Sequence, residues 1–146
     1  NYTLINRAYC IRNPKGYKGY GDDCWGLTAS YSVKGYAAHE PTERGDLGVI
    51  TPTAALSSIV YTPEESMKVM RKLYSMRDKL MGPYGFYDAF SETDNWYPQK
   101  YLAIDQGTTV VMLENYRTGL LWNLFMSHPD VQNGLKKLGY ESPHLK

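Results

Sequence analysis

Two aspartates, Asp88 and Asp105, are placed by their neighbours as the leading candidates for acid–base chemistry. Asp88 lies in the aromatic run of residues 84–90, Tyr-Gly-Phe-Tyr-Asp-Ala-Phe, whose apolar rings would partly remove it from water. Asp105 lies where a loop meets an apolar helix, and an ordinary helix N-cap is the alternative role for it. Two carboxyl groups can serve as general acid and general base, which is the chemistry of glycoside hydrolysis. We expect Asp88 to be the base-side carboxylate, with Asp105 as the second candidate.

The remaining loop carboxylates are expected to form turns or to cap helices. They are Asp22, Asp23, Glu40, Glu43, Asp46, Glu92 and Asp94.

Aromatic residues make up 14% of the chain, and fourteen of them are tyrosines. Tyr and Trp side chains combine a flat apolar face with a polar edge, which suits ligands such as sugars. Trp25, Trp96 and Tyr101 lie in loop regions near acidic residues, so we expect them to bind a sugar. Simple packing of the loops is the alternative explanation for these aromatic rings.

Three polar residues complete the predicted binding site: His39, Gln106 and Glu114. The amino end of a helix beginning near Gln106 would open toward the loops and favour carboxylates and hydroxyls. We therefore expect His39 and Gln106 to converge with Trp25, Trp96 and Tyr101 around one concavity beside Asp88. For Glu114 the alternative is a local ion pair with Arg117, three residues further on.

Several classes of protein are excluded or disfavoured by composition. The net charge of +1 provides no field to hold nucleic acid, and no apolar stretch is long enough to span a membrane. His39, Glu40 and Asp46 match no metal-ligand spacing, and neither a phosphate-binding loop nor a dinucleotide motif occurs, so no metal or cofactor is expected. Cys10 and Cys24 could form a disulfide or remain as two packed thiols.

The elements that position these residues are predicted to be helices joined by long loops. Periodicity and start signals indicate helices near residues 1–11, 52–60, 62–80, 106–126 and 127–139. In the third, Thr62 would be the N-cap and Glu65 would close a capping box. Its apolar stripe would comprise Met67, Met70, Leu73, Tyr74 and Met81.

The helix predicted over residues 106–126 is apolar nearly all round in its second half, so we expect burial on most sides there. Residues 12–50 and 84–101 are predicted to be ordered, functional loops, and a short hairpin is possible near residues 31–36. Nothing else alternates long enough to require a sheet. The pattern predicts an all-α, layered fold of four to five helices.

The order of several motifs resembles the C-terminal signature of the bacterial glucoamylase-like family of glycoside hydrolases. The motifs are the run 84–90, Trp96, the run 101–107 (Tyr-Leu-Ala-Ile-Asp-Gln-Gly) and the run 114–122 (Glu-Asn-Tyr-Arg-Thr-Gly-Leu-Leu-Trp). An earlier block comprises residues 25–30 (Trp-Gly-Leu-Thr-Ala-Ser), Gly35-Tyr36 and residues 50–55 (Ile-Thr-Pro-Thr-Ala-Ala).

This resemblance implies an (α/α)6 toroid with a loop-lined pocket at one end. It also implies hydrolysis of β-glucan, as in relatives that cut β-1,2-linked glucan with inversion and release short sophoro-oligosaccharides. The expected location is the periplasm or, as a lipoprotein, the outer membrane.

A toroid needs about twelve helices, so residues 1–146 are expected to be a single C-terminal segment of a larger catalytic domain. The partners would then be a glucan and a missing N-terminal portion that carries the general acid, and the segment alone would be inactive. The alternative is a carbohydrate-binding module without catalysis.

Overall fold

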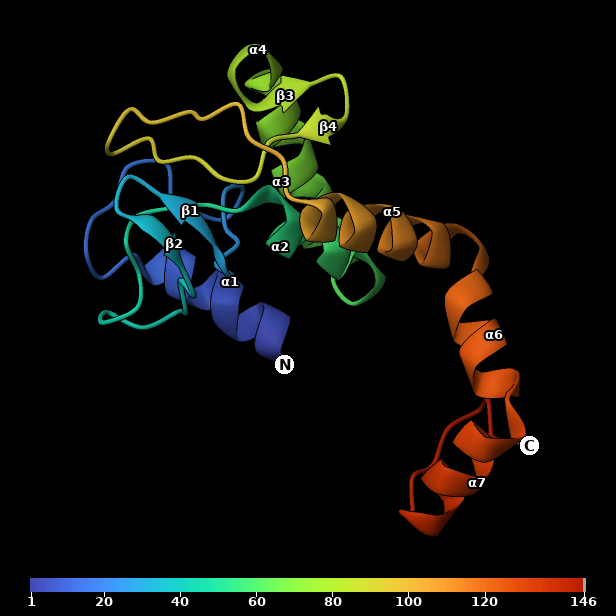
Figure 1. The fold of residues 1–146 in the computed structure, drawn as a ribbon. Helices are drawn as coiled ribbons and strands as arrows, with labels where there is room; N and C mark the ends of the chain where they lie inside the picture. Colours follow the sequence, from blue (N-terminus) through green and yellow to red (C-terminus); the bar gives the residue numbers. More distant parts are fainter. Residues whose placement is uncertain (146) are drawn as a thin grey trace.

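The computed structural model describes residues 1–145, in which a helical arm extends from the main body of the chain (Figure 1). Seven α-helices lie within this range, so the predicted all-α class is confirmed. They are α1 (Tyr2–Arg12), α2 (Pro52–Leu56), α3 (Pro63–Ser75), α4 (Arg77–Leu80), α5 (Ala103–Thr118), α6 (Leu120–Ser127) and α7 (Pro129–Lys137). A 3-10 helix, η1 (Ser57–Val60), extends α2.

Two short antiparallel hairpins accompany the helices. The first joins β1 (Ser30–Ser32) to β2 (Gly35–Ala37), with Tyr31 opposite Tyr36, and confirms the hairpin expected there. The second joins β3 (Met81–Gly82) to β4 (Gly85–Phe86) and was not predicted, because two-residue strands leave no alternating pattern.

The helix count exceeds the predicted four to five because two expected helices are each divided. The helix predicted over residues 62–80 breaks at Met76 into α3 and α4. The helix predicted over residues 106–126 begins earlier, at Ala103, and breaks at Gly119 into α5 and α6. Gly119 has φ 70°, and its N–H donates to Asn115 O at 2.8 Å. Such a left-handed glycine ends a helix, even within an apolar run.

The start of α3 differs from the prediction in its details. Thr62 is the N-cap residue, but its side chain makes no capping hydrogen bond. Its hydroxyl instead donates to Ser58 O (3.3 Å) and pairs with Ser66 Oγ (3.3 Å), so the predicted capping box with Glu65 is wrong. The Thr62 hydroxyl is therefore hydrogen-bonded to the turn before it and not to an N–H group at the start of α3.

The buried face of α3 is rotated from the predicted stripe. Ser66, Val69 and Leu73 face the core, whereas Tyr74 and Met81 are exposed. A small serine on the core face allows close packing that a hydropathy pattern does not reveal.

The core is built from loops as well as from helices. Trp25, Ile50 and Phe90 lie in loops, yet they pack with Tyr9 of α1 and Leu73 of α3 in one buried cluster. Ile50 and Phe90 are also joined by paired backbone hydrogen bonds of 2.9 Å in each direction. The long loops are therefore ordered by burial, as expected. Cys10 and Cys24 belong to the same cluster as free thiols, and no disulfide joins them within the described range.

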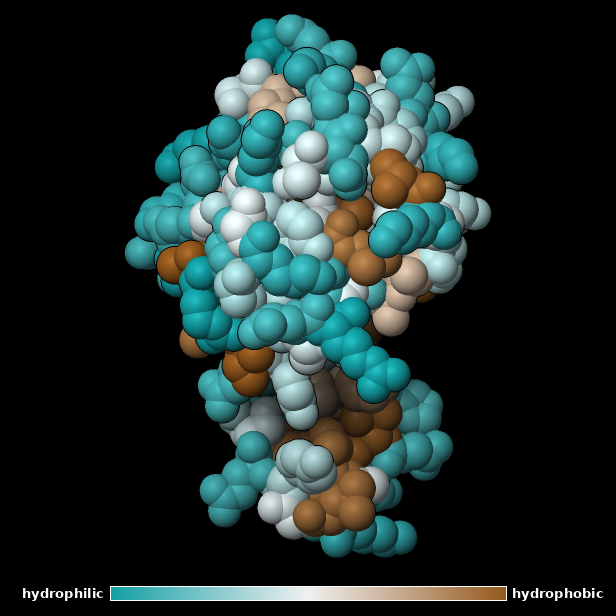
Figure 2. Space-filling view, turned by 90° about the vertical axis from the view of Figure 1, so that its left-hand side faces the viewer, coloured by the Kyte–Doolittle hydropathy of each residue, from teal (hydrophilic) through white to brown (hydrophobic). Residues whose placement is uncertain are grey.

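The arm formed by α6 and α7 extends away from the body (Figure 1). All eight residues of α6 are at least partly exposed, including Leu124 (61%) and Phe125 (62%). The prediction that this segment is buried is therefore wrong for residues 1–145. Apolar side chains are visible on the lower lobe of the surface, which α6 and α7 form (Figure 2). Among the described helices, none combines the length and apolar character needed to cross a bilayer.

The break at Gly119 yields a paired test of glycine function. We expect Gly119→Ala to lower the free energy of unfolding by about 1–2 kcal/mol, because an alanine is strained at φ 70°. Gly107→Ala, within α5 and with open space around the added Cβ, should instead raise it by about 0.5–1 kcal/mol. Urea unfolding of the two variants checks both signs. Equal effects would show that the left-handed turn does not constrain the α5–α6 junction.

Candidate functional site

Asp88 is held between the first hairpin and the loop that precedes α5. Its side chain is buried (1% exposed), and its backbone N–H donates to Lys100 O at 2.9 Å. Its carboxylate Oδ2 accepts a hydrogen bond from the backbone N–H of Tyr31 in β1, at 3.0 Å. The predicted candidate is thus fixed by backbone groups from two segments that lie far apart in the sequence.

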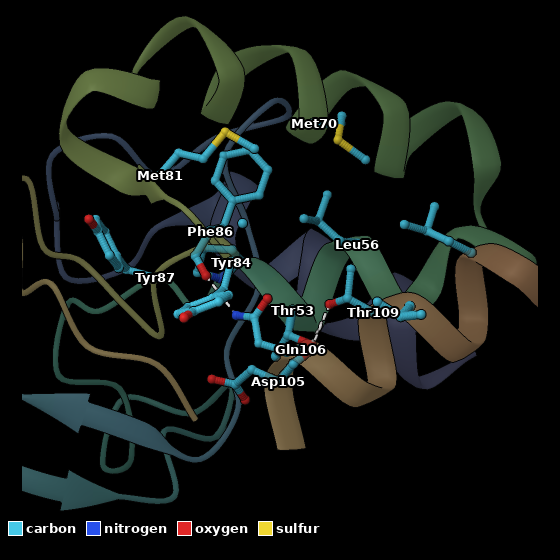
Figure 3. Close-up of a pocket in the computed structure, with 14 residues that line it drawn as sticks. Thr53, Leu56, Met70, Met81, Tyr84, Phe86, Tyr87, Asp105, Gln106 and Thr109 are labelled. Atoms are coloured by element: carbon cyan, nitrogen blue, oxygen red, sulfur yellow. Dashed lines mark hydrogen bonds between the residues drawn. The ribbon is translucent and has the colours of Figure 1, made fainter. Parts of the chain in front are cut away.

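Asp105 lies inside the first turn of α5. The N-cap of this helix is Leu102, so the alternative role of Asp105 as N-cap is wrong. Its carbonyl oxygen accepts a hydrogen bond from Thr53 Oγ1 (3.0 Å), which ties α5 to α2, and another from Thr109 Oγ1 (2.8 Å) within α5. Its carboxyl is directed toward the first hairpin (Figure 3) and is only 6% exposed.

The two carboxyl groups interact directly. Burial, followed by the interaction with the carboxylate of Asp88 and its charge, raises the pKa of Asp105 to about 7. Two adjacent carboxyls resist simultaneous ionisation, so Asp105 holds its proton below pH about 7. Asp88 Oδ1 and Asp105 Oδ2 are buried without a hydrogen-bond partner among residues 1–145. Buried oxygens of this kind are ready to accept a hydrogen bond from a water or a hydroxyl.

His39 lies behind Asp88 rather than on a binding surface. It is buried (1% exposed), and its Nε2 is 3.2 Å from Ser30 O. Burial lowers the pKa of His39, although the Ser30 carbonyl and the charges of Asp46 and Asp88 oppose this effect. The imidazole is therefore neutral at pH 7. His39 does not line the cavity described below, so the direct sugar contact predicted for it is not seen among residues 1–145.

A cavity of about 250 Å³ lies beside Asp105 among α2, α3, the second hairpin and α5 (Figure 3). Its wall is mainly apolar and aromatic, with Asp105 and Gln106 among its polar residues. Other lining residues include Leu56, Met70, Met81, Tyr84, Phe86 and Tyr87. Gln106 Nε2 donates to Phe86 O at 2.8 Å, which fixes the amide at the cavity edge.

Three tyrosines form a cluster at this cavity. The ring of Tyr101 lies 5.5 Å from that of Tyr84 and 5.0 Å from that of Tyr87, between ring centroids. Tyr101 Oη accepts from Tyr84 N (3.3 Å) and donates to Gly85 O (3.4 Å), so it fixes the turn of the second hairpin. Gly82 is required nearby, because a Cβ there would lie 2.3 Å from Tyr101 Oη and 2.5 Å from Tyr87 Oη.

The predicted convergence of five side chains around one concavity is only partly correct. Gln106 lines the cavity and Tyr101 supports its rim, whereas Trp25 is 1% exposed and belongs to the core. Trp25 therefore packs the loops, which was the alternative explanation for it. Trp96 is half-buried in a turn closed by backbone hydrogen bonds to Ser91, and it does not line this cavity.

Glu114 is also separate from the cavity. Its carboxylate forms an ion pair with Arg117 at 3.1 Å and accepts a hydrogen bond from Thr118 Oγ1 at 3.0 Å. The local ion pair that was the alternative for Glu114 is thus present.

Several residues of the site were not singled out from the sequence. Tyr31 contributes a backbone N–H, which no side-chain pattern can reveal. Tyr84 and Tyr87 precede Asp88 in the aromatic run. The sequence indicates that these rings shield the carboxylate from water, but it does not indicate that they line a cavity. Among residues 1–145, no three His, Cys, Asp or Glu side chains are grouped so as to hold a metal ion.

An all-α chain with a desolvated carboxyl pair beside a tyrosine-lined cavity has the features of a carbohydrate-active protein. The Glycoamylase family model, described as "Putative glucoamylase", matches residues 1–129. The chain belongs to this bacterial glucoamylase-like family.

Individual relatives agree with this assignment. The chain is 53% identical over 135 residues to an exo β-1,2-glucooligosaccharide sophorohydrolase (non-reducing end) of Parabacteroides distasonis, covering 92% of this chain. It is 72% identical to the endo-β-1,2-glucanase of Chitinophaga pinensis, with a TM-score of 0.94 over 98% of this chain. It is 79% identical to a "putative glucoamylase" of Bacteroides caccae, with a TM-score of 0.90 over 93% of this chain.

The chain is much shorter than these proteins. It spans 19% of the curated sophorohydrolase, 34% of the Chitinophaga glucanase and 33% of the Bacteroides protein.

The carboxyl pair predicts a specific pH dependence of stability. The folded-state pKa of Asp105, about 7, lies above its unfolded value of about 3.9, so its contribution to stability is present below pH 4 and is lost as pH rises through 7. Asp105→Asn keeps a donor toward Asp88 without the charge. On going from pH 4 to pH 8, the free energy of unfolding of the variant should therefore rise by roughly a few kcal/mol relative to that of the wild type.

Denaturant unfolding across this pH range measures the effect. Asp78→Asn, at an exposed position of α4, is the matched control and should show no such gain. If the difference between wild type and Asp105→Asn is the same at pH 4 and pH 8, the two carboxyls are not coupled in the folded protein.

Proposed function

We propose that this chain is the C-terminal segment of the catalytic domain of a β-glucan hydrolase, with β-1,2-glucan as the substrate. The observation that carries the proposal is the buried pair of Asp88 and Asp105 beside a tyrosine-lined cavity. The names of the relatives, a glucanase and a sophorohydrolase acting on β-1,2-linked glucans, support the choice of linkage.

Because Asp88 and Asp105 lie next to each other, we assign both carboxyls to the same side of the glycosidic bond. A general acid and a general base that flank a glycosidic bond lie about 6.5–9.5 Å apart in inverting enzymes, and about 5–5.5 Å separate acid and nucleophile in retaining ones. Asp88 and Asp105 are adjacent enough for the charge of one to raise the pKa of the other, so we assign both carboxyls to the same side of the bond. The general acid then comes from another part of the enzyme, upstream of Asn1.

Within this scheme Asp88 is the base that activates the attacking water. The N–H of Tyr31 fixes one carboxylate oxygen, which leaves Oδ1 to accept the proton. Asp105, protonated below pH about 7, stabilises the negative charge of Asp88 and keeps its orientation. Attack by water on the face opposite the leaving group would give inversion.

The tyrosine cluster is proposed to hold a glucose unit next to this base. Tyr84 is 75% exposed and contacts Tyr101, so its ring offers an accessible face for a sugar. Gln106 adds a polar group at the same edge. In the whole protein we place the segment within an (α/α)6 toroid, located in the periplasm or anchored to the outer membrane as the family resemblance implies.

The test of this function is Asp88→Asn in the full-length enzyme. The variant should lose at least about a thousandfold in kcat on β-1,2-glucan, because the amide cannot accept the proton from water. Reducing-end release measures the rate. Asp94→Asn, at an exposed position in the same loop, is the matched control and should remain within a fewfold of wild type.

Two outcomes would contradict the proposal. Activity of Asp88→Asn within tenfold of wild type would exclude Asp88 as the base. Binding of glucan by the unmodified full-length protein without any release of reducing ends would favour a non-catalytic binding module instead.

A further inference from the structure

His39 and Asp88 are connected through a single peptide group. The carbonyl of Ser30 faces His39 Nε2 at 3.2 Å, and the N–H of Tyr31 donates to Asp88 Oδ2 at 3.0 Å. These two backbone atoms belong to the same planar peptide unit. A change at the histidine is therefore transmitted directly to the hydrogen bond that holds the candidate base.

The direction of the first hydrogen bond follows from the chemistry of its partners. A carbonyl oxygen only accepts, so Nε2 must carry the proton and donate to Ser30 O. Nδ1 then holds the lone pair of a neutral imidazole, and it has no partner among the described residues. A hydrogen bond accepted at the carbonyl polarises the peptide and strengthens its N–H as a donor.

The surroundings of this peptide are rigid, so its position depends on few contacts. Ser30 and Thr51 are fully buried, and Thr51 Oγ1 donates to Ser30 Oγ at 2.9 Å. Thr51 N in turn donates to Gly26 O at 2.9 Å. The charged groups that act on His39 are Asp46 and Asp88, and neither forms a hydrogen bond with its ring.

The backbone of His39 adds a second indication of constraint. Its φ is 48°, a left-handed conformation that is uncommon for residues other than glycine and is tolerated best by Asn, Asp and His. The loop thus adopts a strained conformation where the imidazole meets the hairpin. Such strain is found where the surrounding structure requires one exact placement.

We propose that His39 is a positioning residue for the hydrolytic base, acting through the 30–31 peptide on the carboxylate of Asp88. The inference rests on the proposed function, since it assigns to His39 a role in the same reaction. His39 does not touch the substrate. It fixes the donor that orients Asp88 and stabilises its ionised form.

The test compares three variants of the full-length enzyme that differ in the donor at this position. His39→Gln places an amide N–H near the position of Nε2 and retains the hydrogen bond to Ser30 O. His39→Met fills a similar volume without a donor. His39→Asn tolerates the left-handed backbone but is too short to reach the carbonyl.

We expect His39→Met and His39→Asn to lower kcat on β-1,2-glucan by about tenfold to a hundredfold with little change in KM, as for a displaced catalytic group. His39→Gln should remain within about threefold of wild type. In the two impaired variants the acidic limb of the pH–kcat profile should move to higher pH, because a weaker donor stabilises the carboxylate less. A purely structural loss of folded protein would lower the rate without moving the limb.

The comparison stays decisive if one variant fails to fold. Should His39→Met not fold, His39→Asn against His39→Gln gives the same contrast between a missing and a retained donor. Equal losses in the Gln variant and the donor-free variants, or no loss in any of them, would overturn the positioning role.

The parallel measurement of Asp88→Asn separates the two proposals. If Asp88→Asn is inactive while all His39 variants match wild type, only the role of His39 fails. If Asp88→Asn is fully active, the proposed base itself is wrong.

Discussion

The shared desolvation of Asp88 and Asp105 is the constraint on which the arrangement of this chain depends. Two carboxyls removed together from water would repel each other if both were charged, and the raised pKa of Asp105 keeps one proton between them near neutral pH. Hydrogen bonds position the two residues of the pair: Tyr31 N donates to the carboxylate of Asp88, and the Thr53 hydroxyl of α2 donates to the backbone carbonyl of Asp105 in the first turn of α5. The hairpins and helices near it can be understood as the framework that supplies these donors.

That framework gains its rigidity from loops rather than from helices alone. Trp25, Ile50 and Phe90 bury apolar surface in the same cluster as α1 and α3, so the segments carrying His39 and Asp88 are fixed by the core. The geometry of the carboxyl pair and the folding of the body are therefore linked. A substitution that loosens this cluster would also displace the carboxyl pair, which is why matched controls are needed for every variant near the site.

The helical arm has a different physical character. Leu124 and Phe125 of α6 expose most of their surface, although the sequence of this helix is apolar on all sides. The chain spans about a third of the solved relatives that it matches, and in the proposed enzyme the remaining domain would cover this arm. The body that holds Asp88 and Asp105, by contrast, buries its own core within residues 1–145.

Local chemistry in the sequence determined the all-α class, the helix starts near residues 62 and 127, the first hairpin and the choice of Asp88 and Asp105 as candidates for acid–base chemistry. The sequence also indicated the family, because the order of the motifs along the chain can be recognised without knowing which residues are in contact. Only the tertiary structure decided that Asp88 and Asp105 lie together, that Trp25 belongs to the core and that His39 is buried against the carbonyl of Ser30. It also decided that Gly119 divides a helix that periodicity had joined. The reason is that periodicity reports which face of one element is apolar, whereas these outcomes depend on partners brought together from distant parts of the chain and on backbone groups that all residues share.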